Sequence, residues 1–247
     1  MLYIMRVKIT VFLLCWLTTS AYSADKMVLN SGDKQTTLVE LFTSEGCSSC
    51  PPAEMYINAL SEDSDLWDDF VPVVFHVDYW DYLGWKDDYA KGAYAHRQRI
   101  YAAQGGVNSV YTPAVLQNGQ AWNYWRMGFS PTDSDLMPGS LSVTVDDNQL
   151  NAVFSSSQYD SQKLILNVAV LGMNMQSHIR DGENEGRHAK HSFVVLGENS
   201  LKSNSKSWRL KLPEFDKNKA SDFALAAWIS TVDSLQPIQS VGGYFKP

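Results

Sequence analysis

The chain has 247 residues, of which 45% are apolar, 12% aromatic and 19% charged. A chain of this length can bury one large core or two smaller ones, at about 100–150 residues per domain. Its apolar content excludes collagen-like, low-complexity and disordered proteins. The formal net charge of −7 argues against a nucleic-acid-binding protein, which usually presents a basic surface, and the mean hydropathy of −0.23 argues against several membrane spans.

The first two dozen residues have the pattern of a secretory signal peptide. Arg6 and Lys8 form a short basic start, and residues 9–17 form an apolar run that is too short to span a bilayer. Small residues follow, so we expect residues 1–23 to be removed by cleavage after Ser23 or Ala24. The sequence therefore predicts a periplasmic or secreted protein with no membrane span after cleavage and a net charge of −9.

Cleavage also removes Cys15 and leaves two cysteines, Cys47 and Cys50. Disulfides persist in the compartments that exported proteins reach. Two cysteines three positions apart close too small a loop to stabilise a fold appreciably, so this pair is better explained by chemistry than by stability.

Residues 25–128 have the pattern of an α/β domain with a mixed sheet. Residues 36–43 and 71–77 read as strands buried on both faces, and an aromatic-rich turn follows at 78–85. Helices are expected at 53–60 and 86–103. Residues 113–117 and 120–126 are expected to form a hairpin that turns at Asn118-Gly119, the dipeptide typical of a type I′ turn.

A polar, Pro-interrupted segment from residue 128 to 140 reads as a linker. Seven short runs with the alternation of β-strands follow, and they predict a smaller antiparallel β-sandwich domain over residues 140–247. The expected strands are 141–145, 149–154, 163–173, 191–196, 208–212, 223–232 and 240–245.

The C-x-x-C pair lies between an expected buried strand and an expected helix, the context in which such a pair is typical of redox chemistry. A thiolate attacks a disulfide, and the second cysteine then resolves the mixed disulfide. We assign Cys47 as the exposed attacking thiol and Cys50 as the resolving thiol. Because Pro51 and Pro52 fit only a first helical turn, we expect the helix to begin between Ser48 and Cys50.

The strand, C-x-x-C and helix are followed about sixty residues later by GVNSVYTPAV and the Asn118-Gly119 turn. This arrangement resembles the thioredoxin superfamily. The resemblance implies a thioredoxin-like domain in which Pro113 is cis and packs against the redox pair, and in which Tyr111 and the Thr112 backbone contact an extended substrate. It also implies a helix after the hairpin, but the polar sequence from Phe129 onward predicts that this helix is short or missing.

Glu40 lies near the position of the buried acid of thioredoxins, but one residue further from the first cysteine. In a strand, an offset of one residue reverses the face. We therefore assign Glu40 no proton-relay role; a solvated or an ion-paired carboxylate is the alternative.

More narrowly, the segments LVELFTSEGCSSCPPAE, FHVDYWDYLGWKD, VYTPAVLQNG and IRDGENEGR resemble an exported bacterial family, the domain of unknown function 1223. This resemblance covers nearly all of the mature chain. It implies a thioredoxin-like fold followed by a β-rich part, without an established substrate.

Three further features have a structural and a functional interpretation. The aromatic residues of 78–85 are expected to fill space between sheet and helix, or alternatively to form one wall of a peptide groove. His76 is expected to be a hydrogen-bonded core histidine. Residues 181–188 are expected to form a loop that needs its two glycines, because His188 and His191 would point to opposite faces of a strand and not to one metal ion.

The leading hypothesis is an exported thiol-disulfide oxidoreductase whose partners are protein or small-molecule thiols and disulfides. A non-catalytic thioredoxin-like binding protein with an inert disulfide is the second hypothesis, and copper(I) binding or delivery by the same cysteines is the third. A zinc site would need two more ligands, and the histidines are scattered. No organic cofactor is expected because no Gly-rich phosphate loop is present.

Overall fold

The computed structural model describes residues 26–132, 134–159 and 163–247. The predicted signal segment, its cleavage site and Cys15 lie outside these residues. In the described ranges, no helix has the length and apolar character needed to cross a bilayer.

A mixed sheet of eight strands forms the centre of the molecule, in the order β14-β13-β8-β11-β3-β2-β4-β5. Its parallel pairs are β2 with β3 and β3 with β11, and the other neighbours are antiparallel. The strands are β2 (Thr37–Thr43), β3 (Phe70–His76), β4 (Ala114–Gln117), β5 (Gln120–Ala121), β8 (Leu164–Met173), β11 (Val194–Ser203), β13 (Asp222–Thr231) and β14 (Gln239–Phe245). Strands β2 and β3 are buried at every position, as their continuous apolar sequences predict.

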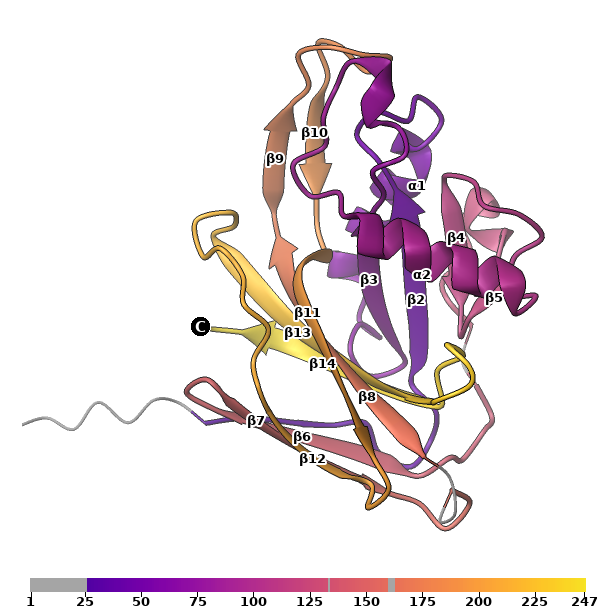
Figure 1. Cartoon of the computed structure of the whole chain (residues 1–247), viewed down its shortest axis with the longest axis vertical. Helices are drawn as coiled ribbons and strands as arrows, with labels where there is room; N and C mark the ends of the chain where they lie inside the picture. Colours follow the sequence, from indigo (N-terminus) through magenta and orange to yellow (C-terminus); the bar gives the residue numbers. More distant parts are fainter. Residues whose placement is uncertain (1–25, 133, 160–162) are drawn as a thin grey trace, which may run out of the picture.

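Two helices cover opposite faces of the sheet at β2 and β3. On one face Thr43 bonds to Glu54 of α1 (Pro51–Ala59), and on the other Glu40 bonds to Arg97 of α2 (Gly92–Ala103). Residues 40 and 43 are three apart in a strand, so they point to opposite sides. Figure 1 shows α2 crossing in front of β2 and β3.

The predicted helix 86–103 begins later than expected, at Gly92. Before it, the chain forms a short 3-10 turn, η2 (Asp81–Leu83), and an irregular segment. The reason is tertiary: the Asp87 carboxylate is buried against His76 and also accepts the Tyr89 N–H, which holds this segment outside helical geometry. Between the hairpin and β6, the only helical turn among the described residues is the 3-10 turn η3 (Tyr124–Met127), in agreement with a short or missing terminal helix.

A second, four-stranded antiparallel sheet packs on the C-terminal part of the large one. Its order is β1 (Met27–Asn30), β6 (Ser140–Asp146), β7 (Gln149–Ser155) and β12 (Ser207–Lys211). A hydrophobic core that includes Leu141, Leu150, Leu166, Leu225 and Ile229 lies between the two sheets. A separate two-stranded hairpin, β9 (Met175–His178) and β10 (His188–His191), extends beside α1 at the top of Figure 1.

One sheet crosses the predicted boundary between residues 128 and 140. Strands β8, β11, β13 and β14 belong to the expected β-sandwich region, yet β11 pairs with β3 through Val194 and Val74. Conversely, β1 from the N-terminal region pairs with β6. The four-stranded sheet packs on the C-terminal strands of the large mixed sheet, so the two regions do not have separate sheets. The sequence did not show this because strand patterns do not indicate which edges pair.

Candidate functional site

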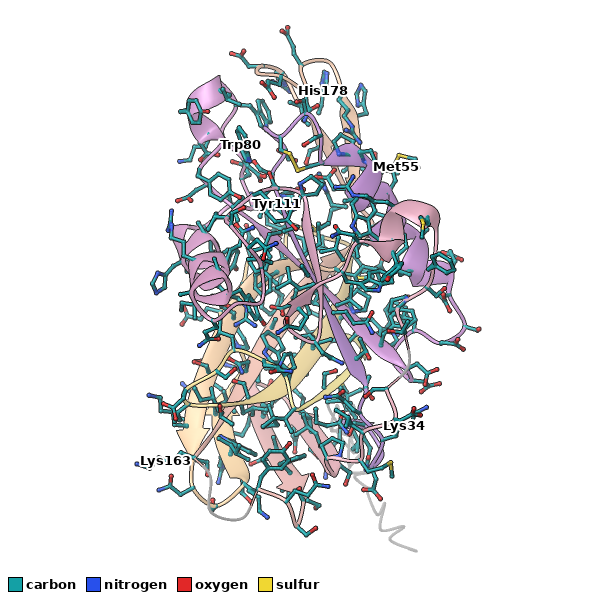
Figure 2. All side chains as sticks on the ribbon, turned by 90° about the vertical axis from the view of Figure 1, so that its right-hand side faces the viewer. Lys34, Met55, Trp80, Tyr111, Lys163 and His178 are labelled. Atoms are coloured by element: carbon teal, nitrogen blue, oxygen red, sulfur yellow. A yellow bond between two sulfur atoms is a disulfide. The ribbon has the colours of Figure 1, made fainter. Side chains whose placement is uncertain are left out.

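Cys47 and Cys50 form a disulfide in the turn that joins β2 to α1. The Cys50 N–H donates to the Cys47 carbonyl at 3.2 Å, and Cys50 is the N-cap of α1. Figure 2 shows the disulfide as a yellow bond between Trp80 on one side and Met55 of α1 on the other.

Two expectations about this turn are wrong. Cys47 is not exposed: it is 2% exposed and Cys50 is 0% exposed, while Ser48 and Ser49 face solvent. The helix begins at Pro51 and not between Ser48 and Cys50, because prolines occupy its first two positions, where a missing N–H costs no hydrogen bond. Cys47 therefore lies four residues before the first helical residue.

The Thr112–Pro113 peptide bond is cis, which confirms the expectation for Pro113. The Thr112 hydroxyl lies beside the redox pair, donating to Sγ of Cys47 at 3.2 Å and accepting from the Trp80 indole N–H at 2.7 Å. In the described part of the chain, the Thr112 backbone N–H and carbonyl make no hydrogen bond. The Tyr111 carbonyl, by contrast, already accepts from the Gln98 amide.

The aromatic segment 78–85 borders the disulfide. A side-chain Cβ at Gly46 would lie 3.3 Å from Cβ of Trp80, so this glycine permits Trp80 to pack closely against the turn. Trp80 is half-buried and its ring stacks near that of Tyr82, which is 76% exposed. The segment therefore both fills space and presents an aromatic surface beside Cys47.

Residues from the C-terminal half hold the turn in place. Asn184, in the loop between β9 and β10, donates its amide to the carbonyls of Glu45 (2.7 Å) and Cys47 (3.0 Å). This is the loop in which Gly182 and Gly186 have positive φ, as expected for 181–188. Sequence reasoning missed its contact with the redox pair, because nothing local to Asn184 indicates where the hairpin docks.

A buried charged network lies beside the same turn. The Asp87 carboxylate bonds to Nδ1 of His76 at 2.7 Å and accepts the backbone N–H of Glu45 at 2.8 Å. The Glu45 carboxylate in turn bonds to the His191 ring at 3.0 Å and accepts the Trp85 indole N–H at 2.7 Å. The His76 and His191 rings meet edge to face. His76 is hydrogen-bonded through Nδ1, as expected, while its Nε2 has no partner among the described residues. The sequence did not indicate that Glu45, Asp87 and His191 would meet in this network.

Three groups of this network have pKa values shifted opposite to the effect of burial. Burial alone would lower the pKa of His76, but the charge and hydrogen bond of Asp87 outweigh it and raise that pKa above its ordinary value. Burial would raise the pKa of Asp87, but His76 holds it below the ordinary range. Burial and the charge of Asp87 would raise the pKa of Glu45, but hydrogen bonding by His191, Ser177 and Trp85 outweighs them and lowers it.

Glu40 lies on the α2 side of β2, opposite the disulfide. Its carboxylate is fully buried and paired with Arg97 at 2.8 Å, and it accepts the Tyr101 hydroxyl. The structure thus supports the ion-paired alternative for Glu40. Within residues 26–132, 134–159 and 163–247, no three His, Cys, Asp or Glu side chains gather as ligands for a metal ion.

Comparison with known proteins gives a family and two similar folds. The model of a protein family of unknown function, DUF1223, matches residues 38–230. A crystal structure of protein AGR_C_4864 from Agrobacterium tumefaciens has a TM-score of 0.59 and 21% identity, over 86% of this chain and 94% of that one. HBP35 of Porphyromonas gingivalis has a TM-score of 0.55 and 16% identity, over 86% of this chain and 76% of that one. No curated protein matches the sequence.

Proposed function

The chain belongs to the DUF1223 family, whose function is unknown, and we propose that it is an exported thiol-disulfide oxidoreductase with a thioredoxin-like fold around its redox pair. One observation carries the proposal: the Cys47–Cys50 disulfide joins a buried strand to a helix, with the Thr112 hydroxyl donating to Cys47. A hydroxyl that donates to sulfur favours the thiolate, which is the form that attacks disulfides.

The sequence of events follows from the chemistry of the pair. The Cys47 thiolate attacks a substrate disulfide and forms a mixed disulfide, while the other substrate sulfur leaves as a thiolate. Cys50 then attacks Cys47, which closes the protein disulfide and releases the second substrate thiolate. The reverse sequence reduces the protein disulfide and oxidises two substrate thiols.

An extended polypeptide is the substrate class that the surroundings favour. The Thr112 backbone has a free donor and a free acceptor next to Cys47, which is what an added strand requires. Tyr82, whose ring lies beside Trp80, is 76% exposed, and Val110 is 38% exposed, so both offer apolar surface for contact. Tyr111 contributes through its side chain in this proposal, because Gln98 occupies its carbonyl.

The burial of both sulfurs favours a second candidate, a thioredoxin-like binding protein with an inert disulfide. An exchange enzyme with Cys47 only 2% exposed must move Trp80 or the Asn184 loop before attack, whereas an inert disulfide needs no access.

Two measurements separate the candidates. For an oxidoreductase, we expect the Cys47 pKa, from the pH dependence of iodoacetamide labelling, to lie below about 8.5, and the redox midpoint to lie within the range of glutathione buffers. Cys47→Ser should abolish exchange with a disulfide-containing peptide, and Cys50→Ser should trap the mixed disulfide. A pKa at or above about 8.5 together with a midpoint below about −300 mV would support the inert disulfide instead.

A further inference from the structure

A buried redox pair needs an internal partner for its proton. Cys50 is fully buried in the disulfide form, so a base inside the protein is better placed than bulk water to take the proton of its thiol. In the proposed reaction, however, Cys50 must lose a proton before it attacks Cys47, because the thiolate is the nucleophile. A buried base next to Cys50 would serve this step.

Glu54 lies one helical turn after Cys50 on the face of α1 that packs against the sheet. Cys50 has helical backbone angles, and its carbonyl accepts the Glu54 N–H at 3.2 Å. Residues four apart on a helix share a face, with Cβ atoms about 5–6 Å apart. Glu54 is only 7% exposed and lies between the buried residues Ala53 and Ile57, so a carboxylate occupies a position where an apolar side chain would be expected.

Among the buried carboxylates described near the disulfide, Glu54 is the one that makes no ion pair. Glu40 is paired with Arg97, Glu45 with His191, and Asp87 with His76. In the part of the chain that the structure describes, Glu54 makes no ion pair, and the hydrogen bond to its side chain comes from the Thr43 hydroxyl at 2.8 Å. That bond orients one carboxylate oxygen and leaves the other available.

A route to solvent begins at the same side chain. Glu54 lines a groove of about 580 Å³ between α1 and the β9–β10 hairpin. It also lines, with His191, a small, partly open space of about 10 Å³, close to what one water molecule requires. A proton on Glu54 therefore has a short path to the solvent in the groove.

Charged groups face Glu54 from several elements. His76 of β3 lies within electrostatic range, and His191 of β10 lines the same small space. The other charged or titratable residues that line the groove are Glu62, Arg187, His188 and Lys190.

Resting on the proposed function, we infer that Glu54 is the proton acceptor for Cys50 when the mixed disulfide is resolved. The Cys50 thiol gives its proton to the Glu54 carboxylate, and its sulfur attacks Sγ of Cys47. The Cys47–Cys50 bond forms, the bond from Cys47 to the substrate sulfur breaks, and the substrate leaves with the electron pair as a thiolate. Glu54 then releases the proton to water in the groove. In the direction of disulfide reduction, Glu54 returns a proton to the leaving Cys50 thiolate.

Reaction of the reduced protein with Ellman's reagent separates the two steps, because attack by Cys47 releases one chromophore and resolution by Cys50 releases the second. In Glu54→Gln, which keeps the volume and the acceptor for Thr43, we expect the second phase to slow by about 100-fold. The first phase should stay within about threefold of wild type, since a general base serves only the step in which its proton moves. The second phase of Glu54→Gln should also rise about tenfold per pH unit, because it then depends on the thiolate fraction alone.

Two further variants make the result specific. Glu54→Asp retains a carboxylate and should recover part of the rate, which a purely structural role would not produce. Glu214→Gln, an exposed glutamate that follows β12, is the control for the loss of a charge and should leave both phases unchanged. Equal second phases in wild type and Glu54→Gln would overturn the role of Glu54 alone. Failure of the wild-type protein to release the second chromophore would overturn the proposed function, and the relay with it.

Discussion

The buried pair of Asp87 and His76 permits a quantitative prediction. One Asp87 oxygen accepts both His76 Nδ1 (2.7 Å) and the Glu45 N–H (2.8 Å), and the other accepts the Tyr89 N–H (2.9 Å). Asp87→Asn is nearly isosteric, but it removes the charge and replaces one acceptor oxygen with a donor. His76, which has no exposed surface, would then have no counter-ion.

Breaking a buried ion pair by removing one partner typically costs about 3–5 kcal/mol. We therefore expect Asp87→Asn to lower the free energy of unfolding by about that amount, a large part of the roughly 5–15 kcal/mol of a typical domain. A second substitution, His76→Gln, should cost less in the Asp87→Asn background than in wild type, because no uncompensated charge remains. The coupling energy from the double-mutant cycle should be about 2–3 kcal/mol.

The loss should depend on pH in a defined way. The lowered pKa of Asp87 means that its contribution is present above the ordinary aspartate pKa of about 3.9 and is lost as the pH falls through the folded value. The raised pKa of His76 means that its contribution is complete below about 6.5 and is lost as the pH rises through the folded value. The difference between wild type and Asp87→Asn should thus be largest between about pH 4 and 6.5.

Urea unfolding of the oxidised protein, followed by tryptophan fluorescence at a series of pH values, measures this difference. Glu40→Gln, which disrupts an ion pair on the other face of β2, is the comparison that separates a general loss of stability from the predicted pH profile. A cost of less than about 1 kcal/mol in that window, or a cost that does not vary with pH, would refute the reasoning.

Three other variants test the site. Asn184→Ala removes the hydrogen bonds to the carbonyls of Glu45 and Cys47, and it should lower the free energy of unfolding by about 1–3 kcal/mol. It should also increase the rate at which dithiothreitol reduces the disulfide. An unchanged reduction rate would contradict a covering role for the loop. Thr112→Val removes the hydroxyl that donates to Cys47 and should raise the pKa of the Cys47 thiol by about one unit, equivalent to about 1.4 kcal/mol. Iodoacetamide labelling at a series of pH values measures this pKa. Labelling profiles that are the same in the variant and the wild type would exclude the effect. Glu40→Gln leaves the largely buried Arg97 without a carboxylate partner and should lower the free energy of unfolding in urea by about 3–5 kcal/mol. The rate of disulfide reduction should not change, because Glu40 faces away from the sulfurs. A slower reduction would contradict this independence of Glu40 and the disulfide.

Local sequence determined the elements whose geometry depends on neighbouring residues. The apolar runs of β2 and β3 make buried strands, and Asn118 and Gly119 both adopt positive φ in the hairpin turn. The cysteine spacing permits the disulfide, and the one-residue offset of Glu40 places it on the face opposite Cys47.

Tertiary structure decided the exposure of the sulfurs and the identity of their neighbours. Cys47 is covered because Trp80 and Asn184 reach it from segments far along the chain, and the Glu45 carboxylate meets His191 for the same reason. The pairing of β11 with β3 joins into one sheet two regions that the sequence pattern predicts to be separate domains. A strand or helix pattern specifies which side of an element is buried, but not which other element buries it, since that choice depends on the packing of the whole chain.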